Sequence, residues 1–175
     1  YRYLLDKGYY IKVIDRQIYG NFIKKSQNIH IVNKDVRKIT HKDFTGYEYI
    51  IHLANIANDP SVELQPSLSW DINVLATDII CKAAIKAKVK KNVFASSGSV
   101  YGIKKEKNVI EDLELKPISV YNKTKMIAER ILLSYRKEID IVCIRPATVC
   151  GVSKRLRLDV SVNMLTYQAI KDRVI

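Results

Sequence analysis

The sequence has few cysteines, few glycines and no long apolar run, and each shortage excludes a class of protein. Cys81, Cys143 and Cys150 are an odd set without metal-binding spacing, so they indicate buried thiols rather than a disulfide framework or a zinc site. No apolar run approaches the roughly 18 to 20 residues that cross a bilayer, and the first residues lack the layout of a signal peptide. We therefore expect a cytoplasmic protein with no membrane partner and no bound metal.

Basic residues outnumber acidic ones by 30 to 18, which gives a formal net charge of +12. Such a charge permits attraction to any polyanion, nucleic acids and nucleotides included. The densest lysine runs, 86–91 and 104–107, do not interleave with aromatic residues as a base-stacking surface does. We interpret them as a solvated surface, and nucleic acid is not the expected partner.

The order of apolar segments predicts an α/β fold. With 47% hydrophobic and 27% charged residues, the 175-residue chain has the composition of one ordinary folded domain. Short β-branched runs alternate with stretches of helical periodicity, a pattern typical of a doubly wound parallel sheet of Rossmann type in three αβα layers. The expected strands are 9–15, 29–32, 49–53, 92–96 and 141–145, and the expected long helices are 72–87 and 120–137.

In an open parallel sheet, ligands bind at the carboxyl ends of the strands, so polar residues there are the first candidates for a site. Asp15 ends the first expected strand, where an acid accepts both hydroxyls of an adenosine ribose and favours NAD over its 2′-phosphorylated form. Asp35 follows the second strand and is placed to lie beside the adenine. Leu53 and Ala54 end the third, where the chain would pass under a cofactor. Each signal is weak on its own, because an aspartate at such a place also serves as a turn or cap residue.

The strongest pattern is a serine cluster followed by a tyrosine and a lysine four residues apart. Tyr121 and Lys125 share one face of the expected helix, and a neighbouring ammonium favours the phenolate form of a tyrosine. Ser97 ends the preceding strand and is placed to hold the same substrate oxygen. The three residues therefore predict a proton-transfer site over which a nicotinamide could accept or return a hydride.

In these segments the chain resembles the extended branch of the short-chain dehydrogenase/reductase family, and specifically its NAD-dependent sugar-nucleotide epimerases and dehydratases. The resemblance covers nearly the whole chain, and an ordered set of matches is far more specific than any one of them. The matching positions are Asp15, Asp35 with Val36, the run 52–54, Asn73, the runs 96–102, 121–125 and 145–149, and Gly151.

The resemblance implies NAD as the cofactor, a nucleotide sugar as the substrate and a role for each matching residue. It makes Tyr121 the acid and base, has Lys125 also bind the nicotinamide ribose, and has Ser97 orient the reacting hydroxyl. Pro146 would lie against the nicotinamide amide, and Asn163 would contact the sugar-nucleotide diphosphate. Further cofactor contacts are implied for Asp15, Asp35, Val36, Leu53, Ala54, Asn73 and Ser96.

Two departures from the family pattern concern the ends of the chain. The six glycines include no Gly-x-Gly-x-x-Gly, so the family's first strand and its pyrophosphate loop are expected to precede Tyr1. Residues 1–150 are then expected to form an NAD-binding Rossmann domain, and 151–175 the start of a substrate-binding region. The fragment is not expected to turn over substrate by itself.

The residues after Ser97 favour one reaction over its relatives. The resemblance implies that 4,6-dehydratases need an acidic pair in the two places where this chain has Gly98 and Ser99, so no local acid or base is available for elimination. The simplest remaining chemistry oxidises a sugar hydroxyl to a ketone and returns the hydride to the other face, which is 4-epimerisation. A reductase of a keto sugar would use the same residues, and oxidation at another carbon stays open.

Three further expectations concern the surface of the protein. Lys154, Arg155 and Arg157 are placed to neutralise a diphosphate, although solvated loop charge explains them equally well. The resemblance implies a homodimer through the two long helices. The charge of +12 also leaves open a nucleotide-binding regulatory or RNA-associated relative that retains the fold without turnover.

Overall fold

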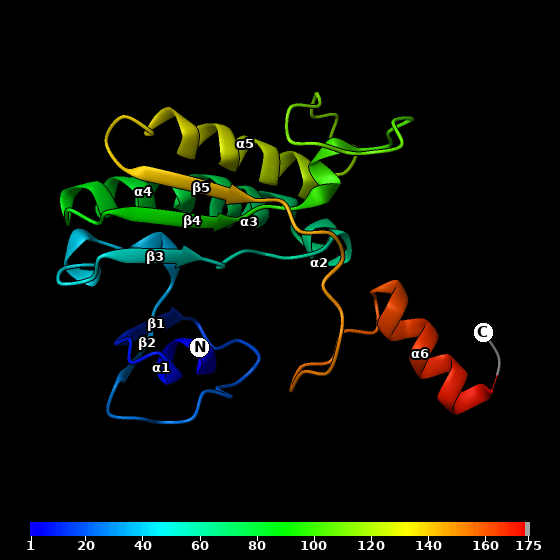
Figure 1. Cartoon of the computed structure of the whole chain (residues 1–175), viewed down its shortest axis with the longest axis horizontal. Helices are drawn as coiled ribbons and strands as arrows, with labels where there is room; N and C mark the ends of the chain where they lie inside the picture. Colours follow the sequence, from blue (N-terminus) through cyan, green and yellow to red (C-terminus); the bar gives the residue numbers. More distant parts are fainter. Residues whose placement is uncertain (174–175) are drawn as a thin grey trace.

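The structure is a computed structural model that describes residues 1–173, and its five strands form two parallel sheets (Figure 1). All five expected strands are present with shifts of one or two residues at their ends. In each sheet the register aligns the carboxyl ends of the strands, which brings the segments that follow them to one edge. The sheets are β1 (Ile11–Asp15) with β2 (Ile29–Asn33), and β3 (Tyr49–His52), β4 (Lys91–Ala95) and β5 (Asp140–Ile144) in that spatial order.

The α/β class with parallel strands is confirmed, but one continuous sheet was expected and the structure has two. β1 pairs only with β2, and β3 pairs only with β4, so the two sheets share no hydrogen-bonded ladder. Among the described residues no strand lies between β1 and β3. The second edge of each of these two strands therefore has no strand partner in this part of the chain.

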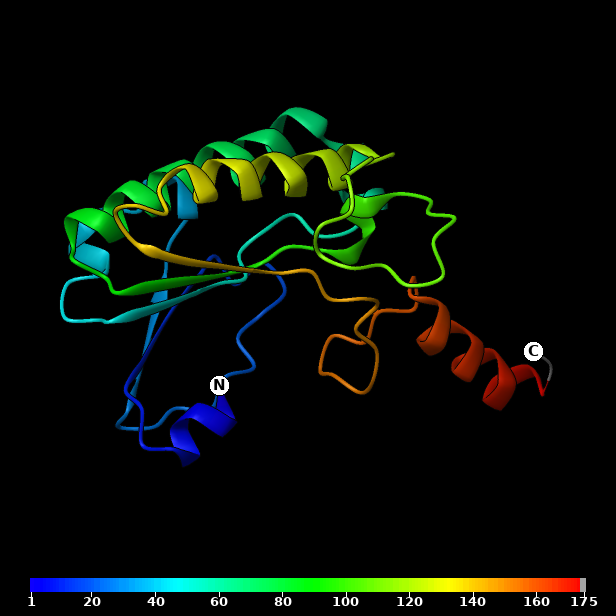
Figure 2. The ribbon, with the colours of Figure 1, turned by 45° about the horizontal axis from the view of Figure 1, so that its top comes forward.

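Helices cover one face of the three-stranded sheet (Figure 2). Ala84 of α4 (Ala76–Lys86) and Ala128 and Leu132 of α5 (Val120–Ser134) are fully buried against Phe94 of β4, the central strand. Complete burial of a leucine-sized side chain contributes about 1.5–3 kcal/mol, so this cluster is the main source of cohesion. No helix within residues 1–173 is long and apolar enough to span a membrane. The helices are α1 (Arg2–Asp6), α2 (Asp59–Leu64), α3 (Pro66–Trp70), α4 (Ala76–Lys86), α5 (Val120–Ser134) and α6 (Ser161–Asp172).

The first expected long helix is interrupted by a π-helical segment, Asp71–Leu75, between α3 and α4. A π turn holds more residues than an α turn and so shifts the phase of the side chains. Ala76, Ile80 and Ala84 are buried as the apolar periodicity predicts, but Leu75 was expected on the same stripe and is 58% exposed. The prediction was wrong for Leu75 because it assumed an uninterrupted α-helix.

The last helix, α6, stands apart from both sheets in Figures 1 and 2. None of its residues is buried. It is preceded by an exposed segment, 147–156, that leaves the end of β5. In the part of the chain that the structure describes, the region expected to begin substrate binding therefore packs little against the rest.

Candidate active site

The expected site residues gather where β4 and β5 end and α5 begins. Ser97 follows β4 and caps a 3₁₀ turn, Gly98–Tyr101, which we call the 98–101 turn. Ser119 caps α5 by accepting a hydrogen bond from the backbone N–H of Asn122, which places Tyr121 in the first turn of that helix. The structure thus brings Ser97 and Tyr121 to the same edge of the sheet, as the sequence predicts.

A chain of polar side chains joins the 98–101 turn to α5. The Ser97 and Ser99 hydroxyl oxygens lie 2.7 Å apart, and the Ser99 hydroxyl donates to the side-chain oxygen of Asn122 at 2.6 Å. The backbone N–H of Ser99 also donates to the Ser97 hydroxyl at 3.2 Å. These bonds hold the Ser97 hydroxyl in one orientation. The role of Asn122 was not predicted, because the sequence spacing gave no reason to select it.

Gly98 lies against the segment that follows β5. Its N–H donates to the carbonyl oxygen of Pro146 at 2.8 Å, and a Cβ at this position would lie 3.2 Å from that oxygen. Such a distance is tighter than ordinary van der Waals contact, so a side chain here would push the two segments apart. The absence of a side chain at Gly98 brings Pro146 and Ser97 into the same site.

Lys125 is buried beneath the site and is fixed by the end of β4. Its Nζ donates to the carbonyl oxygen of Ala95 at 2.7 Å and lies 4.8 Å from the Phe94 ring centroid and 5.9 Å from that of Tyr121. Burial lowers the pKa of Lys125 to about 8, while the nearby carboxylate of Glu129 acts in the opposite direction. The ammonium therefore titrates close to neutral pH.

The sequence predicts that a neighbouring lysine lowers the pKa of Tyr121, and the structure corrects this. Burial is the largest influence and raises the pKa of Tyr121, and the charge of Asp59 raises it further. The charge of Arg157 and the Ser97 hydroxyl act in the opposite direction. Lys125 directs its ammonium to the carbonyl of Ala95, so the cation that acts on this phenol is Arg157 from the loop after β5.

The acids at the ends of β1 and β2 lie side by side but differ in their bonding. Asp15 is exposed, and its carboxylate accepts the N–H of Gln17. Asp35 is only partly exposed and pairs with Arg37 at 2.7 Å and with Arg16 at 3.4 Å. The hydrogen bonds from Arg37 hold the pKa of Asp35 at about 2, despite partial burial that raises it. Asp15 is thus available to a ligand, whereas Asp35 is committed to ion pairs and to capping the turn after β2.

Four other expected cofactor contacts differ in their access to solvent. Leu53 is 68% exposed and Ala54 is half-buried, so the segment after β3 presents its apolar side chains at the sheet edge. Val36 is half-buried and packs against the core. Ser96 is buried, and its hydroxyl oxygen has no hydrogen-bond partner.

Asn73 was expected to contact the cofactor, and the structure gives it another role. Its side chain is fully buried in the π-helical segment. The amide oxygen accepts the N–H of Ile56, and the amide nitrogen donates to the Ile56 carbonyl and to the Thr124 hydroxyl, at 2.8, 3.1 and 3.1 Å. Asn73 therefore ties the segment after β3 to α5 and has no exposed atom with which to meet a ligand.

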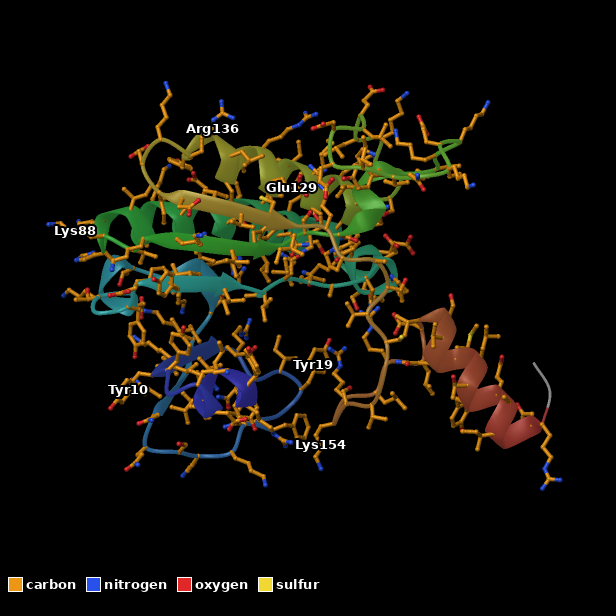
Figure 3. The ribbon with its side chains drawn as sticks, viewed as in Figure 1. Tyr10, Tyr19, Lys88, Glu129, Arg136 and Lys154 are labelled. Carbon is orange, nitrogen blue, oxygen red and sulfur yellow. The ribbon has the colours of Figure 1, made fainter. Side chains whose placement is uncertain are left out.

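Asn163 and Arg155 were expected to bind the substrate, but here both stabilise the loop after β5. The Asn163 amide accepts from the N–H of Gly151 and donates to the carbonyl of Arg157, each at 2.9 Å. The Arg155 guanidinium lies 3.1 Å from the ring centroid of Tyr19, which Figure 3 labels beside Lys154 and this loop. The side chains of Asn163 and Arg155 thus bind other parts of this chain, and the sequence spacing did not predict these contacts.

The remaining reactive side chains offer no metal centre among residues 1–173, where no three His, Cys, Asp or Glu side chains cluster. Burial lowers the pKa of His52 to about 4, and the charge of Lys125 adds to this, so the imidazole is neutral at working pH. Cys81 is buried and Cys143 half-buried, but Cys150 is exposed. The expectation that Cys150 is a packing residue was wrong, because it lies in the exposed segment after β5.

Sequence reasoning missed a buried ion pair beside the site. Glu129 is 1% exposed and lies one turn after Lys125 on α5, where the Arg145 guanidinium pairs with it at 2.8 Å. An acid in the same stripe as Ala128 and Leu132 was a usable signal, because a charge at a core position requires a partner. Its partner lies 16 residues away along the chain, which spacing alone cannot show.

Gly102 ends the 98–101 turn and gives a first testable prediction. Its φ of +68° is one that side chains rarely adopt, and a Cβ would overlap the carbonyl oxygen of Lys116. We expect Gly102→Ala to lower the free energy of unfolding by about 1–3 kcal/mol. Gly46→Ala is the matched control, since Gly46 has a φ of +85° with no atom within 4 Å of the added Cβ. Urea unfolding that gives both variants the same loss would contradict the predicted overlap.

Parallel strands whose carboxyl ends meet at a Ser–Tyr–Lys cluster define a Rossmann-type α/β protein. Residues 1–171 match the NAD dependent epimerase/dehydratase family. The chain belongs to this family, whose members are sugar-nucleotide epimerases and dehydratases. The family membership implied by the sequence is thereby confirmed.

Individual relatives are similar over most of this chain. It is 32% identical over 149 residues to the UDP-glucose 4-epimerase of Bacillus subtilis, covering 74% of this chain and 41% of that protein. It is 31% identical over 157 residues to a putative UDP-glucose 4-epimerase of Methanocaldococcus jannaschii, covering 85% and 50%. The structure of the UDP-glucuronic acid 4-epimerase of Bacillus cereus in complex with NAD matches with a TM-score of 0.81 at 27% identity, covering 98% of this chain and 58% of that one. The chain thus spans about half the length of its relatives.

Proposed function

We propose that the protein carrying this chain is an NAD-dependent epimerase that inverts C4 of a nucleotide sugar. The observation that carries the proposal is the convergence of Ser97, Tyr121 and Lys125 at one sheet edge. The two residues that follow Ser97 are Gly98 and Ser99, where the related dehydratases are expected to have an acidic pair. An elimination needs an acid or base at such a place, and neither residue can act as one.

The residues present fit NAD at its two ends. Asp15 is exposed at the end of β1, where a carboxylate can accept the adenosine ribose hydroxyls. Among residues 1–173, Lys125 is the one buried cation, and it would hold the nicotinamide ribose through its remaining N–H groups. When bound, NAD supplies the hydride acceptor, which the twenty amino-acid side chains do not offer.

The protein's own residues account for the proton. Tyr121, as the phenolate, would remove the proton from the C4 hydroxyl, and with bound NAD as the acceptor of the C4 hydride the product of this half-reaction would be a 4-keto sugar. Ser97 would donate a hydrogen bond to the reacting oxygen, and the positive charge of Arg157, which lowers the pKa of Tyr121 against the effect of burial, would favour the phenolate. With the hydride returned to the opposite face, Tyr121 would give its proton back to the oxygen, so the product would have the mass of the substrate.

The test is mass-resolved chromatography of nucleotide sugars incubated with the whole protein and NAD, without added reductant. A new peak of unchanged mass is the expected result, because every atom removed from the substrate is returned. A product lighter by one water would contradict the inference from Gly98 and Ser99 and indicate a dehydratase. If no nucleotide sugar gives a product, the protein is next incubated with a keto sugar and reduced cofactor. Turnover in that second assay would indicate a reductase.

Two features of the whole protein extend this proposal. The loop 151–160 and α6 would begin the substrate-binding region, because Arg157 of this loop already acts on Tyr121 electrostatically. The outer faces of α4 and α5 would form the interface of a homodimer. Light scattering of the whole protein at several concentrations tests the second statement.

A further inference from the structure

Burial of the Glu129–Arg145 ion pair carries an unfavourable desolvation free energy, which is unusual in a small core. Glu129 accepts from the Arg145 guanidinium through both carboxylate oxygens, from Nε at 3.0 Å and from Nη2 at 2.8 Å. A buried pair of this kind often stabilises a fold no better than apolar residues of the same volume. Its position therefore calls for an explanation beyond cohesion.

The contacts of the third guanidinium nitrogen of Arg145 explain why the ion pair lies beside the active site. Nη1 donates to the Tyr101 hydroxyl at 2.7 Å and to the carbonyl oxygen of Glu111 at 3.1 Å. The guanidinium also stacks on the Tyr101 ring, 5.0 Å from its centroid. Arg145 thus holds the last residue of the 98–101 turn, and the next residue, Pro146, accepts the N–H of Gly98, the first residue of that turn.

We propose that Arg145 is a positioning residue of the active site, oriented by Glu129, and that it fixes the Tyr101 end of the turn behind Ser97 while its neighbour Pro146 fixes the Gly98 end. Two consecutive residues after β5 hold the two ends of one short turn, and the carboxylate that aims the guanidinium lies on α5, the helix that carries Tyr121. The three segments that supply the site are therefore joined by one network. The proposal deepens the proposed function, because the reaction it serves is the one proposed above.

Glu129 has a second effect, because Lys125 lies one turn before it on the buried side of α5. The groups that face Lys125 are Tyr121 and Glu129 on the same helix and the neutral His52 at the end of β3. Among them only Glu129 is negatively charged at neutral pH, and it raises the pKa of Lys125 against the effect of burial. Removing the carboxylate is therefore expected to release the proton of Lys125 at lower pH.

The first test compares the hydroxyls of two tyrosines, Tyr101 in the 98–101 turn and Tyr135 directly after α5. Tyr101→Phe deletes the contact with Arg145, and Tyr135→Phe deletes a hydroxyl that donates to Asp78 at 2.7 Å. Tyr135 follows the last residue of α5, about 20 Å from Tyr121 at 1.5 Å per residue, beside Arg136, which Figure 3 labels. We expect Tyr101→Phe to lower kcat about tenfold or more and Tyr135→Phe to leave it unchanged. Equal kcat values for the two variants would overturn the proposal.

The second test reads the pH dependence of kcat, which loss of stability alone does not shift. Glu129→Gln is expected to move the alkaline limb to lower pH by about half a unit or more, and Glu129→Asp to restore it. An unmoved limb in a folded Glu129→Gln protein would contradict the effect on Lys125. If that variant does not fold, the Tyr101→Phe comparison still decides the positioning role.

A third readout separates this proposal from the proposed function. Hydrogen exchange of the Gly98 and Gly102 amides, which bond to Pro146 and Ser99, reports the order of the turn without any substrate. We expect faster exchange in Tyr101→Phe and no change in Tyr135→Phe. A wild-type protein that converts no nucleotide sugar would refute the proposed function only, whereas unaltered exchange in Tyr101→Phe would refute the positioning role only.

Discussion

Replacing Tyr121 by phenylalanine is expected to lower the turnover of the whole enzyme by about 10²- to 10⁴-fold, the usual contribution of a general acid or base. The substitution removes one hydroxyl and leaves the ring that Lys125 faces at 5.9 Å. NAD affinity should stay close to that of the wild type, because the hydroxyl handles the substrate proton. Initial rates with the nucleotide sugar found by the mass assay, and calorimetric titration with NAD, give the two quantities.

Tyr10→Phe serves as the control for this prediction. Tyr10 is 75% exposed and lies directly before β1 of the two-stranded sheet, whereas the candidate site lies at the three-stranded sheet (Figure 3). Loss of its hydroxyl should change neither turnover nor NAD affinity. Unchanged turnover in Tyr121→Phe would end the assignment of Tyr121 as the acid and base, whatever the reaction is.

Replacing Lys125 by methionine should harm both cofactor binding and turnover. The ammonium is expected to hold the nicotinamide ribose in place over the site, and losing such an electrostatic group costs about 10²- to 10³-fold in kcat. Methionine fills a similar volume without a buried charge, so the free energy of unfolding should change little even though the bond to Ala95 is lost. NAD titration, initial rates and urea unfolding separate these effects.

The matched control is Lys123→Met, an exposed lysine two residues earlier on α5. It removes the same charge from the same helix but not from the site, and should leave all three measurements unchanged. The pH dependence adds a further check, because the pKa of Lys125 is about 8 and its ammonium is lost above that pH. Turnover is expected to decline as pH rises through 8. If Lys125→Met matches the control, the Tyr–Lys spacing is a coincidence.

The fold was largely predictable because its signals are local. Each strand is a short β-branched run, and each covering helix carries an apolar stripe that the sequence displays directly. The π-helical segment was not predictable, and it contains Asn73, whose side chain bonds the backbone of Ile56, 17 residues away, in a contact that local periodicity does not report. The exposure of Leu75 goes with the phase shift of that segment.

The sequence was enough to predict that Ser97 and Tyr121 lie together, but not the electrostatics around them. Strand ends and helix periodicity place Ser97 and Tyr121 together without any tertiary information. The pKa of Tyr121 depends instead on how deeply the phenol is buried and on Arg157 in a distant loop, neither of which spacing reports. The same reason explains why Asn163 was expected to bind a diphosphate and is found bonded to the loop before it.

The separation of the two sheets has a consequence for how this stretch of chain behaves in water. The second edges of β1 and β3, within residues 1–173, present backbone N–H and carbonyl groups that no neighbouring strand satisfies. Solvent can satisfy them, but so can any extended polypeptide that arrives with the right spacing, because an open edge is a template for strand addition. Residues 1–175 alone would therefore have a tendency to self-associate through backbone pairing, and a strand that filled those edges would join the marginal two-stranded sheet to the three-stranded one.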